Sequence, residues 1–256
     1  KVMATTYLDL TNEVLRELNE IPLTSANFAT AIGLQKFVKD AVNKSIFDIA
    51  NAEPQLPFFS AGVSGSTDPF YGNTTVATVA GQRFYTLKDG SSSITTDFAS
   101  IDWDDFYITT INVSGESSPY VSKGLKFLTL ADWRRYYRDS ENSDDADSTH
   151  AEPVYVIKSP DSRKFGLSPI PDKVYNVHFY AFTKPTALDA HGDTMALPEQ
   201  YSNVVTARTR YYVWQFKESP QQAAFALDDY KKGMKHMKSN LMNPTPKYMT
   251  DDRTYF

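Results

Sequence analysis

The chain has 256 residues, no cysteine, a formal net charge of -5 and an aromatic fraction of 14%. The missing cysteines exclude disulfides, thiol chemistry and cysteine-ligated metal sites. The acidic balance argues against tight binding of free nucleic acid, which depends on an excess of Lys and Arg. No apolar run approaches the roughly 20 residues that span a bilayer. The aromatic excess is typical of proteins that bury surface against other proteins, and it also occurs in aromatic-rich sheets.

The first 52 residues carry two helical patterns. Apolar side chains recur at helical spacing in the first pattern, at Tyr7, Leu10, Val14, Leu18 and Ile21. Residues 31–52 repeat this spacing, and Pro54 ends it because the proline ring disfavours helical geometry in the preceding residue. We therefore expect a helical hairpin, followed by an extended loop rich in Pro, Gly, Ser and Thr. Together these make residues 1–74 the first expected segment.

Strand patterns dominate residues 75–185, which we expect to form a β-rich insertion. β-Branched and aromatic residues fill 82–87, 106–113 and 154–157. Residues 174–182 alternate, which predicts one strand with Tyr175, Val177, Phe179 and Ala181 on a single face. Within the insertion, Thr129 opens a short helix, with Asp132 three residues later.

Two further helices are expected in residues 186–242. The first begins with Pro198 in its first turn and runs through Val205, Tyr212 and Phe216. The second has apolar residues spaced by four and three, namely Ala223, Leu227, Tyr230, Met234, Met237 and Leu241. Residues 243–256 have no periodicity and are expected to be extended. The predicted fold class is α+β, with a helical bundle formed by the N- and C-terminal helices, a β-rich insertion in the middle and an extended C-terminal arm.

A search for catalytic and metal-binding motifs finds none. The chain contains no HExxH, no GxSxG and no phosphate-cradling glycine loop. Asp189, His191 and Asp193 alternate as metal ligands on a strand would, but the glycine and threonines around them favour a turn. The acidic run 139–147 lacks the glycine and the glutamate of a calcium loop, so a solvated loop is the better interpretation. We therefore expect no catalytic residue, no metal site and no cofactor.

One aromatic and basic stretch is a candidate interface. Trp133, Arg134, Arg135 and Tyr136 interleave side chains that could stack on bases or bind a partner protein. The plain alternative is a short helix with packed aromatics and with arginines paired to nearby acids. The acidity of the whole chain favours a protein partner over DNA.

The order and spacing of four stretches carry a resemblance to a known family. They are Tyr7 to Pro22 at the opening helix, Gln82 to Phe98 at a strand and turn, Phe165-Gly166-Leu167-Ser168-Pro169-Ile170-Pro171-Asp172 before the alternating strand, and Leu197-Pro198-Glu199-Gln200-Tyr201 before the long helix. In this order they resemble the head–tail adaptor family of tailed bacteriophages, of the tail tubular protein A or tail accessory factor type.

The resemblance implies a non-enzymatic structural protein in the neck of the virion, assembled in the host cytoplasm. It implies a ring, commonly of twelve copies, that binds the portal protein and a downstream tail protein such as a nozzle, tube or terminator. Genomic DNA would pass through the ring during ejection without specific binding, and no membrane would be involved. In such relatives a C-terminal extension reaches the portal. The matching residues here are Tyr248, Met249, Tyr255 and Phe256, which a partner could bury.

Two other functions remain open from the sequence. A different tail component, such as a tail terminator or tube-completion protein, would share the structural role. A glycan-binding or glycan-degrading protein would use aromatic strands and paired carboxylates such as Asp104 and Asp105. Neighbouring residues of a strand point to opposite faces, which places that pair poorly for acid–base catalysis.

Overall fold

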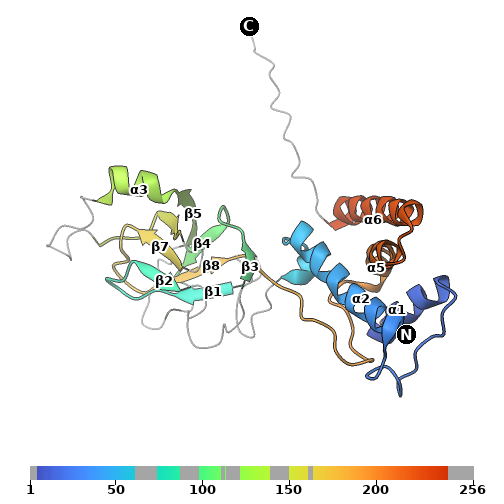
Figure 1. Cartoon of the computed structure of the whole chain (residues 1–256). Helices are drawn as coiled ribbons and strands as arrows, with labels where there is room; N and C mark the ends of the chain where they lie inside the picture. Colours follow the sequence, from blue (N-terminus) through green and yellow to red (C-terminus); the bar gives the residue numbers. More distant parts are fainter. Residues whose placement is uncertain are drawn as a thin grey trace, which may run out of the picture. The chain divides into compact units, whose positions relative to one another are not determined.

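The computed structural model describes residues 5–60, 74–86, 98–110, 113, 122–138, 150–160 and 164–241. The fold is mixed α+β, as predicted, with five α-helices and a large curled β-sheet among these residues (Figure 1). The chain forms two compact units, which we call the helical unit (Lys1–Phe59 with Pro185–Phe256) and the sheet unit (Ser60–Lys184). None of the described helices is long and apolar enough to cross a membrane.

The helical unit is built from two helices near each end of the chain. Its elements are α1 (Tyr7–Glu17), α2 (Gly33–Ala52), a short 3-10 turn (Pro57–Phe59), a second such turn (Glu199–Tyr201), α5 (Ser202–Phe216) and α6 (Pro220–Leu241). Helix α5 is central, since it packs against α1, α2 and α6, and α1 also packs against α2 (Figure 1). Segments separated by about 150 residues in sequence therefore share one core.

Helix α1 is defined by local signals at both ends. Thr6 and Asp9 form a capping box, in which the Thr6 hydroxyl accepts from the Asp9 amide and the Asp9 carboxylate accepts from the Thr6 amide. The helix ends at Glu17, although the predicted apolar stripe continues to Ile21. Asn19 has a φ of 57°, a left-handed geometry that asparagine tolerates and that a helix cannot continue through. The prediction for the end of this helix is therefore wrong by about one turn.

Two buried hydroxyls join α2 to α5. Ser45 Oγ lies 3.1 Å from Thr209 Oγ1, and each hydroxyl also lies within hydrogen-bond distance of a carbonyl of its own helix. Both side chains are fully buried. Because a hydroxyl has one hydrogen and two acceptor positions, the pair shares its donors between the contact and the two carbonyls.

We expect the Ser45 and Thr209 hydroxyls to be energetically coupled. Ser45→Ala and Thr209→Val should each lower the free energy of unfolding by about 1 kcal/mol, the usual net value of such a bond. The double variant should lose less than the sum of the two, because each single change already removes the shared contact. Denaturant unfolding of the four proteins completes the cycle. Strict additivity would show that the hydroxyls bond only to their own helices.

The sheet unit contains a seven-stranded sheet in the order β1-β8-β4-β5-β6-β7-β2 and a two-stranded sheet of β3 and β9. All pairings are antiparallel except β5 with β6, and helix α3 lies in the connection between those two strands. The bounds are β1 (Thr74–Ala77), β2 (Phe84–Thr86), β3 (Phe98–Ile101), β4 (Phe106–Thr109), β5 (Ser122–Leu128), α3 (Leu130–Tyr136), β6 (Tyr155–Lys158), β7 (Lys164–Ser168), β8 (Asn176–Phe179) and β9 (Ala181–Thr183).

The single strand predicted over 174–182 is two strands in different sheets. β8 lies in the large sheet between β1 and β4, whereas β9 pairs with β3. The alternation still holds across the break, because Tyr175, Val177, Phe179 and Ala181 are all buried. The alternation of side chains along the chain specifies which face of each strand is buried. It does not specify which neighbouring strand each one pairs with.

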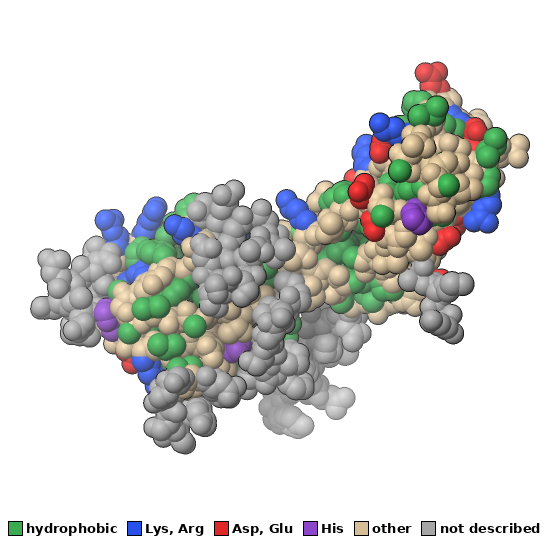
Figure 2. Space-filling model, turned by 90° about the horizontal axis from the view of Figure 1, so that it is seen from below, with side chains coloured by type: hydrophobic (Ala, Val, Ile, Leu, Met, Phe, Trp, Pro, Cys, Tyr) green, Lys and Arg blue, Asp and Glu red, His purple; other side chains and the backbone are tan. Residues whose placement is uncertain are grey.

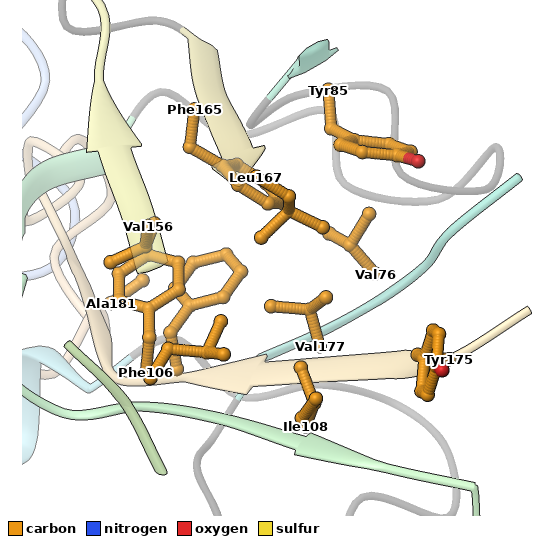
Figure 3. Close-up of a cluster of buried hydrophobic side chains, with 12 residues drawn as sticks. Val76, Tyr85, Phe106, Ile108, Val156, Phe165, Leu167, Tyr175, Val177 and Ala181 are labelled. Carbon is orange, nitrogen blue, oxygen red and sulfur yellow. The ribbon is translucent and has the colours of Figure 1, made fainter. Parts of the chain in front are cut away.

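Aromatic rings fill the core of the sheet unit. Phe106 stacks on Phe179 with 4.9 Å between ring centroids and on Trp103 with 5.4 Å. Figure 3 shows Phe106 among the side chains of several strands, which gather on one face of the curled sheet. The aromatic excess of the sequence is thus used in part for packing inside this unit.

Candidate functional site

The connections from α1 to α2 and from α5 to α6 lie at one end of the helical unit. Exposed apolar side chains lie at the same end. Helices α1 and α5 end there, and helices α2 and α6 begin there. Lys217 Nζ, just after α5, lies 3.6 Å from Glu20 Oε1, just after α1, which joins the two reversals. Ile21, Ile32 and Phe216 at this end are 77%, 79% and 60% exposed.

These side chains form one patch. Phe216 stacks on Phe37 of α2 with 4.5 Å between ring centroids. The Gln35 side chain donates to the carbonyl of Ile21 at 3.0 Å, which holds Ile21 beside the start of α2. We call Ile21, Ile32, Phe37 and Phe216 the apolar end. Clustered exposed apolar side chains with a polar rim are a feature of protein-interaction sites.

Sequence reasoning missed the apolar end. Ile21 and Phe216 both belong to predicted apolar stripes, which are expected to face a core. Ile21 is exposed because α1 stops before it, and Phe216 is exposed because it lies in the last turn of α5. A usable signal is the position of each residue, since both stand immediately before a chain reversal marked by Pro22 or Pro220.

A polar network on one side of the helical unit ties α2, α5 and α6 together. The Asp48 carboxylate accepts from Arg208 Nε at 2.8 Å and from the hydroxyl of Tyr212. The Arg208 guanidinium also lies about 5 Å from the ring centroids of Tyr212 and Tyr230. Because the groups come from three helices, the network links α2, α5 and α6 at the surface of this unit.

The candidate interface on α3 divides into buried and exposed residues. Trp133 is 7% exposed, and the Arg83 guanidinium lies over its ring at 4.8 Å, so Trp133 packs within the sheet unit. Arg134 and Arg135 are exposed, and Tyr136 is 65% exposed. Neither arginine forms an ion pair with the residues that the structure describes. Contact of these three residues with a partner stays a prediction.

The residues weighed for chemistry have structural roles. The Asp193 carboxylate accepts from the amides of Asp189 and Ala190 at 2.7 and 2.8 Å, which lowers its pKa and closes the predicted turn. Within the described ranges, no group of three His, Asp or Glu side chains could hold a metal ion. Asp104 and Asp105 lie in the bend before β4, not on a strand, and burial raises the pKa of Asp105.

His178 is the most deeply buried histidine in the described part of the chain. Its Nδ1 lies 3.0 Å from Thr75 Oγ1 of β1, and its Nε2 lies 2.9 Å from Thr109 Oγ1 of β4. The ring is 6% exposed and spans three neighbouring strands. This arrangement engages both nitrogens in the sheet, which suits packing better than proton transfer to a substrate.

We compared the sequence with known protein families and with curated proteins. The sequence profile of the SU10 adaptor protein family matches residues 5–253. The chain belongs to the SU10 adaptor protein family. No curated protein matches it. Family membership supports the phage structural adaptor expected from the sequence, and the matched range includes both units of this SU10 adaptor.

Three predicted segments of the SU10 adaptor lie wholly or mostly outside the described residues. They are the extended loop, of which 61–73 are not described, the acidic run 139–147, and the C-terminal arm with Tyr248, Met249, Tyr255 and Phe256. Over the described helical unit, Figure 2 shows both basic and acidic side chains at the surface.

The Tyr212 hydroxyl should make the stability of this SU10 adaptor sensitive to alkaline pH. Burial and the hydrogen bond to the Asp48 carboxylate raise the pKa of Tyr212 to about 12, against an opposing effect of Arg208. The protonated hydroxyl therefore stabilises the folded state fully below pH 10, and this contribution is lost as the pH rises toward 12.

Thermal unfolding of the wild type and of Tyr212→Phe between pH 8 and 12 tests this effect. The stability difference between the two proteins should be constant up to about pH 10, the ordinary tyrosine pKa, and should shrink above it. Other tyrosines titrate equally in both proteins, so the difference isolates Tyr212. A difference that stays constant to pH 12 contradicts the expectation.

Proposed function

We propose that this SU10 adaptor is a non-enzymatic structural protein of the phage neck that connects the portal protein to a downstream tail protein. The observation that carries the proposal is the apolar end, three of whose side chains are at least 60% exposed, on a unit whose helices α2 and α5 are joined by the Arg208 network. Family membership over residues 5–253 supports the same role. An adaptor needs such surfaces because it works by binding two different proteins at once.

We further propose a ring, of twelve copies, that surrounds the DNA exit channel. The net charge of -5 per copy supports passage of DNA without specific binding, because like charges repel the phosphates. The ring would lie in the virion neck after assembly in the host cytoplasm. Direct mass measurement of the assembled complex gives the copy number.

The proposed architecture is the bundle with a β-rich insertion and a C-terminal arm, of the tail tubular protein A or tail accessory factor type. The division of the chain supports it, since the helical unit contains both ends of the chain and the sheet unit contains the middle. Such a layout gives one chain two compact units, each of which can bind a different protein.

Portal binding is the direct test. The purified chain, mixed with its portal, should form a ring that is visible by negative-stain microscopy and measurable by native mass spectrometry. Ile32→Asp with Phe216→Asp should weaken assembly at least tenfold, because a charge in a desolvated apolar contact is strongly unfavourable. Val79→Asp with Val174→Asp, at positions 55% and 40% exposed in the sheet unit, adds the same two charges and is the matched control. Normal assembly of the double variant removes the apolar end from the proposal.

Absence of any complex with the portal contradicts the adaptor role. Localisation of the chain at the end of a tail tube, away from the portal, would instead support the tail terminator or tube-completion alternative. One reconstruction of the intact particle neck separates these two structural roles.

Removal of residues 243–256 should leave the fold intact and weaken portal binding. The segment contains Tyr248, Met249, Tyr255 and Phe256, which we propose as the portal-binding arm. A partner that buries these rings would contribute about 25 cal/mol per Å² of apolar area. The melting temperature and the portal affinity of the truncated chain give the two readouts. Unchanged affinity excludes the arm, and a lowered melting temperature assigns the segment to the fold.

A further inference from the structure

The large sheet of the sheet unit has an outer face, opposite the face that carries the aromatic core. Val156 of β6 belongs to that core, so the side chain of the preceding Tyr155 points to the outer face. The ring of Tyr137, directly after α3, lies 5.6 Å from the ring of Tyr155, and α3 packs on β6 (Figure 1). The Arg83 guanidinium, just before β2, lies 4.8 Å from the centroid of the Trp133 ring. Helix α3 is therefore attached to the outer face at two points.

Two arginines and a tyrosine of α3 point away from the sheet. Trp133 is 7% exposed and marks the side of the helix that packs. At about 100° of helix turn per residue, Arg135 lies roughly 200° from Trp133, almost opposite to it. Arg134 and Tyr136 lie on the two sides of Arg135, and all three side chains are exposed. The Arg135 guanidinium lies over the Tyr136 ring, 5.9 Å from its centroid, so a cation and an aromatic ring are presented together.

Two residues of the sheet extend this surface. Lys126 of β5 is the register partner of Tyr155 and therefore points to the same outer face. Phe84 of β2 precedes the core residue Tyr85, so its ring also lies on the outer face, over Gly166 of β7. The ring is 49% exposed, since the glycine has no side chain to cover it. We call these residues the basic face, namely Phe84, Lys126, Arg134, Arg135 and Tyr136.

The basic face has cations that the described part of the chain does not neutralise. Three of them form no ion pair among the described residues, namely Lys126, Arg134 and Arg135. The one carboxylate of α3, Asp132, accepts from the Thr129 hydroxyl at 2.6 Å within the helix cap. A guanidinium offers a planar fork of donors that matches a carboxylate, and Arg and Tyr are enriched where proteins meet. The basic face therefore fits a surface with carboxylates and with apolar groups that cover the two exposed rings.

We propose that the basic face binds an acidic surface of the downstream tail protein. The proposal rests on the adaptor role proposed above and assigns one of its two contacts. The apolar end and residues 243–256, which we assign to portal binding, belong to the helical unit. The sheet unit is thereby left for the other partner, and its basic face carries the charge that an acidic partner complements.

A partner protein fits the basic face better than DNA does. Tight binding of duplex DNA uses about 6–10 phosphate contacts, whereas the basic face offers three cations. A long polyanion would also lie against other parts of a chain whose net charge is -5, and these would repel its phosphates. A protein surface of limited extent avoids that repulsion and can bury the exposed rings of Phe84 and Tyr136.

Binding of the tail protein to the preformed portal–adaptor complex tests the contact. Arg134→Gln with Arg135→Gln should weaken the affinity for the tail protein at least tenfold and leave the affinity for the portal unchanged, as measured by biolayer interferometry. Lys231→Gln with Lys235→Gln removes two charges from exposed positions of α6 and is the matched control, which should bind the tail protein normally. All variants should keep the wild-type melting temperature, because the altered side chains are exposed. Normal affinity of the arginine variant for the tail protein overturns the proposal.

Salt dependence separates the charged part of the contact from the aromatic part. The affinity of the wild type for the tail protein should fall as ionic strength rises, and the arginine variant should show a flatter dependence, because the screened ion pairs are lost. Tyr136→Ala should weaken binding severalfold and keep the wild-type salt dependence, since it removes apolar area and no charge. Equal salt dependence of the wild type and the arginine variant overturns the carboxylate contact.

DNA and a second copy of the chain are the competing occupants. A short DNA duplex that binds the wild type at physiological salt, and fails to bind the arginine variant, would assign the basic face to nucleic acid. Self-association of the chain without portal that the same changes abolish would assign it to contacts between copies. Either result, with the affinity for the tail protein unchanged, overturns the proposal.

The two proposals fail in distinguishable ways. A portal–adaptor complex that binds the tail protein normally after both arginine changes overturns the basic-face contact and leaves the adaptor role in place. A wild-type chain that binds neither the portal nor the tail protein overturns the adaptor role, and the basic-face contact with it.

Discussion

Replacing Phe106 by alanine should lower the free energy of unfolding of the sheet unit by about 3–5 kcal/mol, the range for a large ring removed from a packed core. Phe106 is 1% exposed and contacts Trp103, Phe165 and Phe179 through stacked or tilted rings. Trp103 and Phe106 come from the bend and the start of β4, whereas Phe165 comes from β7 and Phe179 from β8. The cavity left by the missing ring would therefore loosen several strands at once, and collapse of one strand could not fill it.

Denaturant unfolding followed by tryptophan fluorescence measures the loss, since Trp103 stacks directly on Phe106. Phe127→Ala is the control, because Phe127 is 40% exposed in the same unit and its truncation should cost clearly less. The helical unit should keep its own transition. Equal losses for the two variants would show that Phe106 is not central to this core.

Replacing Gly233 by leucine should lower the free energy of unfolding of the helical unit by about 3 kcal/mol, at the upper end of overpacking effects. A Cβ atom at Gly233 would lie 2.9 Å from Val204 Cγ2, so α5 and α6 approach each other closely at this glycine. Val204 is buried, and a valine in a helix is largely restricted to one side-chain rotamer. The added side chain must therefore separate the two helices.

Two matched variants separate packing from helix propensity. Ala224→Leu places the same side chain at an exposed position of α6 and should be nearly neutral. Gly233→Ala should cost less than Gly233→Leu, because alanine adds only the Cβ atom, whereas both variants gain about 1 kcal/mol of helix propensity over glycine. Thermal unfolding gives the three values. A neutral Gly233→Leu would contradict the close approach of α5 and α6.

Local signals predicted many elements well. The periodicity over 31–52 corresponds to α2, and Thr129 caps α3 by accepting from the Asp132 amide. Both predictions succeed because a helix and its cap depend on residues within four positions of one another. The strand predicted over 106–113 is shorter, since β4 ends at Thr109. β-Branched composition indicates a strand, but its length depends on how far the partner strands continue.

The candidate site was predicted less well than the fold. The stretch around Trp133 carries interface-type residues, yet Trp133 itself is buried beneath Arg83. The apolar end has no motif, because its residues come from two chain reversals and the helix ends beside them, which meet only in the folded unit. Likewise Asp48 and Arg208, 160 residues apart, show no relation in the sequence.

The sequence by itself determined the α+β class, the absence of cysteine chemistry, most helix positions and the buried face of the strand at 174–182, because spacing and propensity act over a few residues. Only the tertiary structure decided that Ile21, Phe216 and Phe225 are exposed and that β8 and β9 lie in different sheets. Burial and contact depend on which distant faces pack together, and a local pattern carries no information about that choice.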